Sequence, residues 1–171
     1  MTATPSMYAT SVPVLQQILG GLAAVLAKAD AHATAKSIDP NALLQARLFP
    51  DMFALVRQVQ VACDFAKGAA ARLAGVDVPK MDDTETTFAQ LQARIAAVQA
   101  FMATLKPEQF DTAATREIVT QAGTPKEKRF TGQTYLVHYA MPHFYFHVTT
   151  AYNLLRHNGV ELSKKDFVGS V

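Results

Sequence analysis

The histidines are the residues whose type and spacing point most directly to chemistry. Four of the five lie between residues 135 and 159, and His143 and His147 are four residues apart. On a helix this spacing places both imidazoles on one face. Neutral imidazole is a common ligand for zinc and nickel, and the pair supplies two ligands of a three-ligand site. Such a site keeps an open position for water or a thiolate.

The same histidines also fit a second interpretation, as ordinary core residues. The apolar stripe of the last segment passes through both rings, in the order Leu136, Ala140, His143, His147, Thr150 and Leu154. A buried ring without a partner costs about 1–3 kcal/mol, but a carbonyl, a carboxylate or a water satisfies it as well as a metal does. The neighbouring aromatic residues, Tyr145 among them, suit a packed core or an apolar pocket equally well.

A metal site needs a third ligand, and Asp51 is the best carboxylate candidate. It follows Pro50 and flanks the apolar stripe of the second segment, although an acid at that place is also a common helix-dipole partner. His32 continues the stripe of the first segment. If the last helix starts at the end where the first one finishes, these groups meet. We therefore expect a metal site of His143, His147 and Asp51, in a pocket shared with His32 and Tyr145.

The elements that must position these residues are helices. Apolar residues recur at steps of three and four in four segments, at about 11–34, 40–74, 82–106 and 131–158. Pro13 fits the first turn of the first helix, and Asp39 with Pro40 starts the second. Pro50 predicts a kink or a restart near residue 49, and Gly75 ends that segment. The acids at 82–85 are typical of the N-terminus of the third helix.

Between the third and fourth helices the pattern changes. Residues 116–121 and 128–131 flank "AGTPKE", which indicates a small hairpin. Pro142 lies within the fourth helix and should bend it, freeing the carbonyl of His138. Phe167 and Val168 should fold back over the bundle. These features predict an all-α four-helix bundle with a small β-hairpin, forming a single domain over residues 1–171.

Composition excludes several classes of function. The net charge is only +2 and no stripe of lysine and arginine stands out, which argues against nucleic-acid binding. The one cysteine, Cys63, allows no internal disulfide and is interpreted as a packing residue. We see no secretory signal, no apolar run of membrane-spanning length and no nucleophile elbow or phosphate loop. The expected location is the cytoplasm.

The stretch "MPHFYFHVTTAYNLLRHNGVELSKKDFVG" resembles the C-terminal signature of a bacterial family known as domain of unknown function 1993. "ARLFPDMFALVRQVQVACDFAKGAAARLAG", "KADAHA" and "DTETTFAQLQARI" resemble its second, first and third helices. That family is similar in fold to the DinB/YfiT-like metalloenzymes, in which a histidine of helix two and an HxxxH pair of helix four hold a divalent metal. The resemblance matches His143 and His147 to the pair. The second helix here has no histidine, and Asp51 is the nearest substitute.

Two functions follow as expectations. The resemblance implies a divalent-metal-dependent enzyme, with zinc or nickel, acting on a small or thiol-bearing molecule; relatives of this fold include thiol transferases and maleylpyruvate isomerase. The alternative is a metal-free, non-catalytic bundle that binds a small ligand or dimerises. A homodimer is compatible with either function, since bundles of this size often pair through helix faces.

Overall fold

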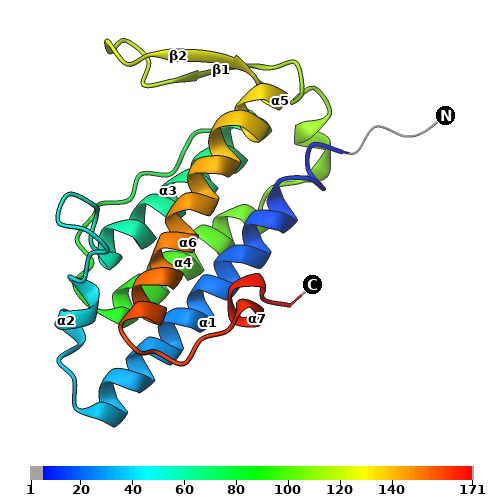
Figure 1. Cartoon of the computed structure of the whole chain (residues 1–171). Helices are drawn as coiled ribbons and strands as arrows, with labels where there is room; N and C mark the ends of the chain where they lie inside the picture. The colour runs from blue at the N-terminus through cyan, green and yellow to red at the C-terminus, as the bar shows by residue number, and fades with distance from the viewer. Residues whose placement is uncertain (1–5, 171) are drawn as a thin grey trace.

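Four long helices form the bundle in the computed structural model, which describes residues 6–170 (Figure 1). They are α1 (Val12–Lys36), α3 (Leu55–Ala74), α4 (Phe88–Ala103) and α6 (Met141–His157). The shorter elements are α2 (Pro40–Leu44), η1 (Pro107–Phe110), β1 (Glu117–Thr120), β2 (Lys128–Thr131), α5 (Gly132–Tyr135), η2 (Leu136–Ala140) and α7 (Lys164–Val168). The predicted four-helix bundle is therefore confirmed.

The apolar stripes of the four long helices meet in one core. Leu22, Leu55, Leu91 and Leu154, one from each long helix, are all buried there. β1 and β2 pair antiparallel, as predicted, and project beyond one end of the bundle in Figure 1. The C-terminal tail also folds back as predicted, since the Phe167 ring meets Tyr152 edge-on at 6.0 Å between centroids.

The second predicted helix is interrupted rather than kinked. Asp39 caps α2 by accepting from the Asn41 N–H at 2.9 Å, but α2 ends at Leu44 and α3 begins only at Leu55. The segment between them closes into a loop, because the Leu55 N–H donates to the Ala46 carbonyl at 3.0 Å. The ten residues between α2 and α3, which include Pro50, therefore form an irregular loop.

The acidic segment before α4 does not start that helix. Thr87 and Gln90 form a capping box instead. Asp83 and Glu85 reach the guanidinium of Arg94, at 2.9 and 3.0 Å, and the Arg94 side chain is only 1% exposed. The acids thus neutralise a buried cation. Leaving that cation unpaired would cost more free energy than an acid gains from the helix dipole.

Asp64 carries this network across to α3. Its carboxylate lies 2.9 Å from Arg94 and 2.9 Å from Lys67. Cys63 is fully buried nearby, which confirms its assignment as a packing residue. Burial raises the pKa of its thiol to about 12. The thiol therefore stays protonated in the folded protein.

The last helix accommodates Pro142 by widening one turn. Residues of η2 are π-helical, and the Met141 N–H donates to the Leu136 carbonyl, five residues back. A proline has no N–H and its ring displaces the carbonyl four residues before it, so the chain inserts the extra residue just upstream. α5, η2 and α6 still run as one rod in Figure 1, and Gly159 ends it with φ of 89°.

One helix among residues 6–170, α1, is long and apolar enough to cross a membrane by length and composition, contrary to the reading of the sequence. Half of its most apolar window is buried inside the bundle. Its apolar stripe is thus used by α3, α4 and α6, as in the core helix of a folded domain.

Candidate functional site

His147 of α6 is held by a buried glutamine of α3. The ring is 8% exposed, and its Nδ1 lies 2.7 Å from Oε1 of Gln58. Gln58 Nε2 donates to the Phe53 carbonyl at 3.2 Å. A carbonyl only accepts, so the amide nitrogen faces Phe53 and Oε1 faces the histidine. Nδ1 must therefore carry the proton of the neutral ring, and Nε2 carries the lone pair without a protein partner among residues 6–170.

Both histidines are neutral at pH 7. Desolvation lowers the pKa of His147 to about 4, assisted by the charges of His143 and Arg57. Desolvation, followed by the charge of Lys128, lowers the pKa of His143. The charged groups that act on the two rings are thus all cationic. Of the two cations, Arg57 is paired with Asp83.

The two imidazoles belong to a continuous series of rings, which we call the aromatic row: Phe53, Phe146, His147, Phe65, His143 and Tyr139. Phe65 stacks on His143 at 4.6 Å between centroids with an interplanar angle of 3°. It also lies 6.0 Å from His147. Phe146 meets His147 edge-on at 5.3 Å, and Tyr139 meets His143 edge-on at 4.7 Å.

The aromatic row is partly open to solvent and has a cation near each end. Phe53 is 49% exposed and Phe146 is 55% exposed. Arg57 lies 5.8 Å from the centroid of the Phe53 ring, and Lys128 lies 5.3 Å from that of Tyr139. Arg57 is paired with Asp83, whereas Lys128 has no ion-pair partner among residues 6–170. Lys128 therefore offers a cation without an ion-pair partner in that part of the chain beside the half-buried Tyr139 ring, at the end of the row away from Phe53 and Phe146.

Helical spacing on two neighbouring helices builds this arrangement. Tyr139, His143 and His147 follow one another at steps of four along η2 and α6. Gln58 and Phe65 are seven residues apart on α3, so they also share a face. The packing of α3 against α6 brings the two faces together, and β2, just before α5 in the chain, adds Lys128.

The expected third metal ligand does not join the pair, which corrects the sequence analysis. Asp51 is exposed in the loop before α3, and no group of three or more His, Cys, Asp or Glu side chains in residues 6–170 is placed to hold a metal ion. The physical reason is the interruption of the second helix. Asp51 lies in irregular chain rather than on a helical face that looks into the bundle.

His32 is also remote from the pair, contrary to expectation. It lines a surface depression with Lys36 and Glu161, beyond the C-terminal end of α6. The prediction required the last helix to start where α1 ends. Instead α1 and α6 end at the same end of the bundle (Figure 1), while His143 and His147 lie in the first half of α6.

Tyr145 does not share the face of the histidines either. It lies two residues before His147, which is about 200° around the helix. Its half-buried ring contacts Phe144 at 5.7 Å. Desolvation raises the pKa of its phenol.

Sequence reasoning missed Gln58, Phe65 and Lys128. Gln58 had a signal, since a glutamine between Leu55 and Ala62 on an apolar stripe needs a buried polar partner. Lys128 had none, because its position depends on where the hairpin folds.

The donor set does not fit the three-ligand metal site of the fold family. Two imidazoles are present, and the position on α3 that faces them holds Gln58, whose amide already bonds to His147 and to the Phe53 carbonyl. The nearby charges of Arg57 and Lys128 also oppose a divalent cation.

Fold and site together define a DinB-like helical bundle with a histidine–aromatic surface. A crystal structure of a DinB family member from Shewanella denitrificans is 44% identical to this chain, with a TM-score of 0.90 over 96% of this chain and 93% of that one. The model of domain of unknown function 1993 matches residues 7–168, so the chain belongs to that family. No curated protein matches the chain. The resemblance seen in the sequence is thus confirmed.

Proposed function

We propose that this DinB-like protein binds a small planar anion, such as an aromatic carboxylate, on the aromatic row and without a metal. The observation that carries the proposal is the charge around the histidines. Arg57 and Lys128 are the cations that act on the two rings, and Lys128 has no ion-pair partner among the described residues. The exposed His143 ring and the half-buried Tyr139 ring, next to Lys128, offer surfaces for stacking.

Each part of the site has a distinct task in this proposal. Lys128 pairs with the carboxylate beside the Tyr139 ring. The ligand ring packs against the neighbouring Tyr139 and His143 rings, which contributes about 0.5–1.5 kcal/mol beyond area burial. His147 Nε2 accepts from a hydroxyl or N–H group on the ligand, because Gln58 holds the proton on the other nitrogen.

A metal-dependent enzyme is the second candidate, and one observation favours it. A ligating histidine usually donates its other ring N–H to a neighbouring group, which fixes the ring orientation, and Gln58 does this for His147. Zinc or nickel would then be held by His143 and His147 alone. We rank this candidate second, because two imidazoles beside two cations make a weak site for a divalent metal.

A titration with charge-varied ligands tests the proposal. Benzoate, benzamide and benzylammonium have similar shapes and differ in charge, so their dissociation constants are measured by NMR on the same sample. Benzoate should bind roughly tenfold or more tightly than benzamide, since a charge-assisted hydrogen bond is worth about 1.5–3 kcal/mol. Benzylammonium should bind most weakly.

The matched variants are Lys128→Gln and Lys126→Gln, which remove one cation each from the same hairpin. Lys128→Gln should abolish the preference for benzoate over benzamide, and Lys126→Gln should leave it intact. Equal binding of the three ligands would refute the proposal. One equivalent of zinc or nickel, lost in a His143→Ala/His147→Ala variant, would establish the metal site in its place.

A further inference from the structure

A cavity of about 530 Å³ lies away from the histidines, at the end of the bundle that carries the hairpin. Its walls come from the turn before α1, from η1 and the turn after it, from α5 and η2, and from the first residue of α6. This volume falls in the range of ordinary small-molecule pockets, about 300–1,000 Å³.

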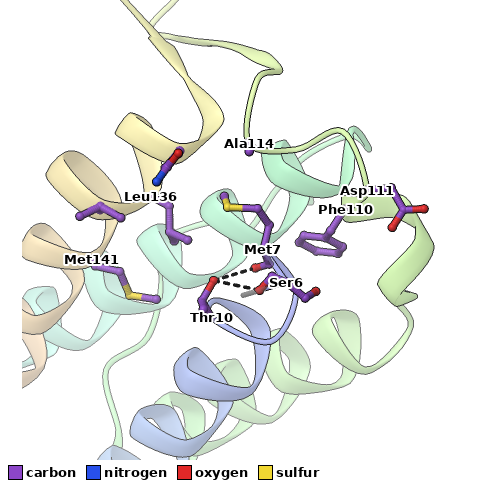
Figure 2. A pocket seen from close by; sticks show the side chains of 10 residues that line it. Ser6, Met7, Thr10, Phe110, Asp111, Ala114, Leu136 and Met141 are labelled. Atoms are coloured by element: carbon purple, nitrogen blue, oxygen red, sulfur yellow. Dashed lines mark hydrogen bonds between the residues drawn. The ribbon is translucent and has the colours of Figure 1, made fainter. Parts of the chain in front are cut away.

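The interior of this cavity is mainly apolar and adaptable. Figure 2 shows the side chains of Met7, Leu136 and Met141 converging, with the Phe110 ring on the opposite side. Thioether side chains reshape easily around a ligand, because they are unbranched and polarizable. Val137 adds another apolar wall and is 53% exposed. A large apolar side chain left open beside a cavity marks a surface that a ligand can cover.

The polar groups of the lining select the head group. The Thr10 hydroxyl donates to the carbonyl of Ser6 at 3.1 Å or of Met7 at 3.4 Å, so its oxygen is left as an acceptor (Figure 2). Asp111 is the one charged residue of the lining, and its carboxylate is directed away from Leu136 (Figure 2). The cavity therefore has no cation for an anionic head group and no buried carboxylate for a cationic one.

We propose that this cavity binds an uncharged, mainly apolar small molecule whose hydroxyl or N–H group donates to Thr10, for example a medium-chain alcohol. A carboxylate head would bury its charge without a facing cation, because Ser6, Thr10 and Gln133 offer only neutral donors. An ammonium head would lose its hydration without a facing anion, which is costly in an apolar site.

One turn of η2 contributes residues both to this cavity and to the aromatic row. Leu136 of η2 lines the cavity, while Tyr139 of the same π-helical turn contacts His143. π-helical turns are rare and occur frequently at functional sites. The widened turn is thus placed between the two sites.

The test uses the full chain carrying ¹³C-methyl methionine. 1-Octanol, octanoate and octylammonium are titrated separately, each below its critical micelle concentration or solubility limit. 1-Octanol should shift the methyl signals of Met7 and Met141 saturably, while those of Met52 and Met81 stay in place. Octanoate and octylammonium should bind roughly tenfold more weakly or worse, because each must bury an unpaired charge.

Two variants test whether residues of the cavity lining bind the ligand. Thr10→Val keeps the shape and removes the acceptor, and it should weaken 1-octanol binding about fivefold. Val137→Asp should weaken it roughly tenfold or more. The matched control is His138→Asp, on the same helical turn but outside the lining, and thermal unfolding verifies that all three variants fold.

The proposal is overturned by equal affinity for the three head groups, by uniform shifts of all methionine methyls, or by the absence of saturable binding. It is also overturned if His138→Asp weakens binding as much as Val137→Asp does.

Discussion

The burial of His147 makes folding stability depend on pH in a defined window. Desolvation, with the charges of His143 and Arg57, lowers the pKa of His147 from 6.5 to about 4 in the folded protein. The unfolded chain recovers the ordinary value. Between pH 6.5 and pH 4 the unfolded state therefore binds more protons than the folded state, so stability falls as the pH decreases through this window.

The magnitude follows from the size of the pKa difference. Each pKa unit is worth about 1.36 kcal/mol, so His147 alone should cost about 2 kcal/mol by pH 5 and about 3 kcal/mol by pH 4. Above pH 6.5 its contribution is fully present. The comparison at pH 5 is the more useful one, because most carboxylates of the Arg94 network are still ionised there.

The assay is urea unfolding at pH 7 and pH 5, for the natural chain and for His147→Gln. The variant keeps a side-chain N–H to donate to Gln58 but has no titrating ring. The natural chain should lose about 2 kcal/mol more than the variant between the two pH values. This difference cancels the titration of groups common to both proteins.

NMR titration of the His147 ring then checks the cause. Gln58→Glu places a carboxylate against Nδ1 and should raise the pKa of His147 by about 1–3 units. The reasoning fails if the ring of the natural chain titrates near pH 6.5, or if both proteins lose the same stability on acidification.

Three further predictions concern the scaffold. Arg94→Met should lower the free energy of unfolding by roughly 2–3 kcal/mol in urea, below the value for a fully buried pair, because two of the facing carboxylates are partly exposed. Gly132→Ala should destabilise by about 1–3 kcal/mol or more, since its Cβ would clash with the Ala113 carbonyl oxygen. Gly20→Ala, on the exposed face of α1, should instead stabilise by up to about 1 kcal/mol, and thermal unfolding compares the two variants. Cys63, with its pKa raised to about 12, should resist iodoacetamide at pH 8 until urea unfolds the chain, and modification of the native protein would contradict its burial.

Much of the scaffold follows from local pattern. The three–four periodicity located the long helices, because burying one face per helix is the dominant demand in a bundle. Asp39, Gly75 and Gly159 marked real element ends, since capping and left-handed geometry depend on neighbours in the chain. The hairpin after residue 116 was predicted for the same reason, from a short turn between two extended stretches.

Expectations failed where one element competes with another. The loop between α2 and α3 is closed by contacts of its own, so a single proline did not reveal that the helix stops for ten residues. Asp83 and Glu85 form ion pairs with the buried Arg94 of α4 instead of acting on the N-terminus of that helix. In each case a tertiary partner outweighed the local preference.

By itself, the sequence determined the helices, the family and the presence of His143 and His147 on one face, because each of these depends on spacing along one segment. The tertiary structure alone decided what those histidines meet. Because α1 and α6 run in the same direction, His32 lies far from the histidine pair. Because Asp51 lies in the loop before α3, it does not join the pair either. The packing of α3 on α6 supplied Gln58, and the way the hairpin folds back brought Lys128 to the Tyr139 ring. Contacts between segments depend on relative direction and register, which no single segment encodes.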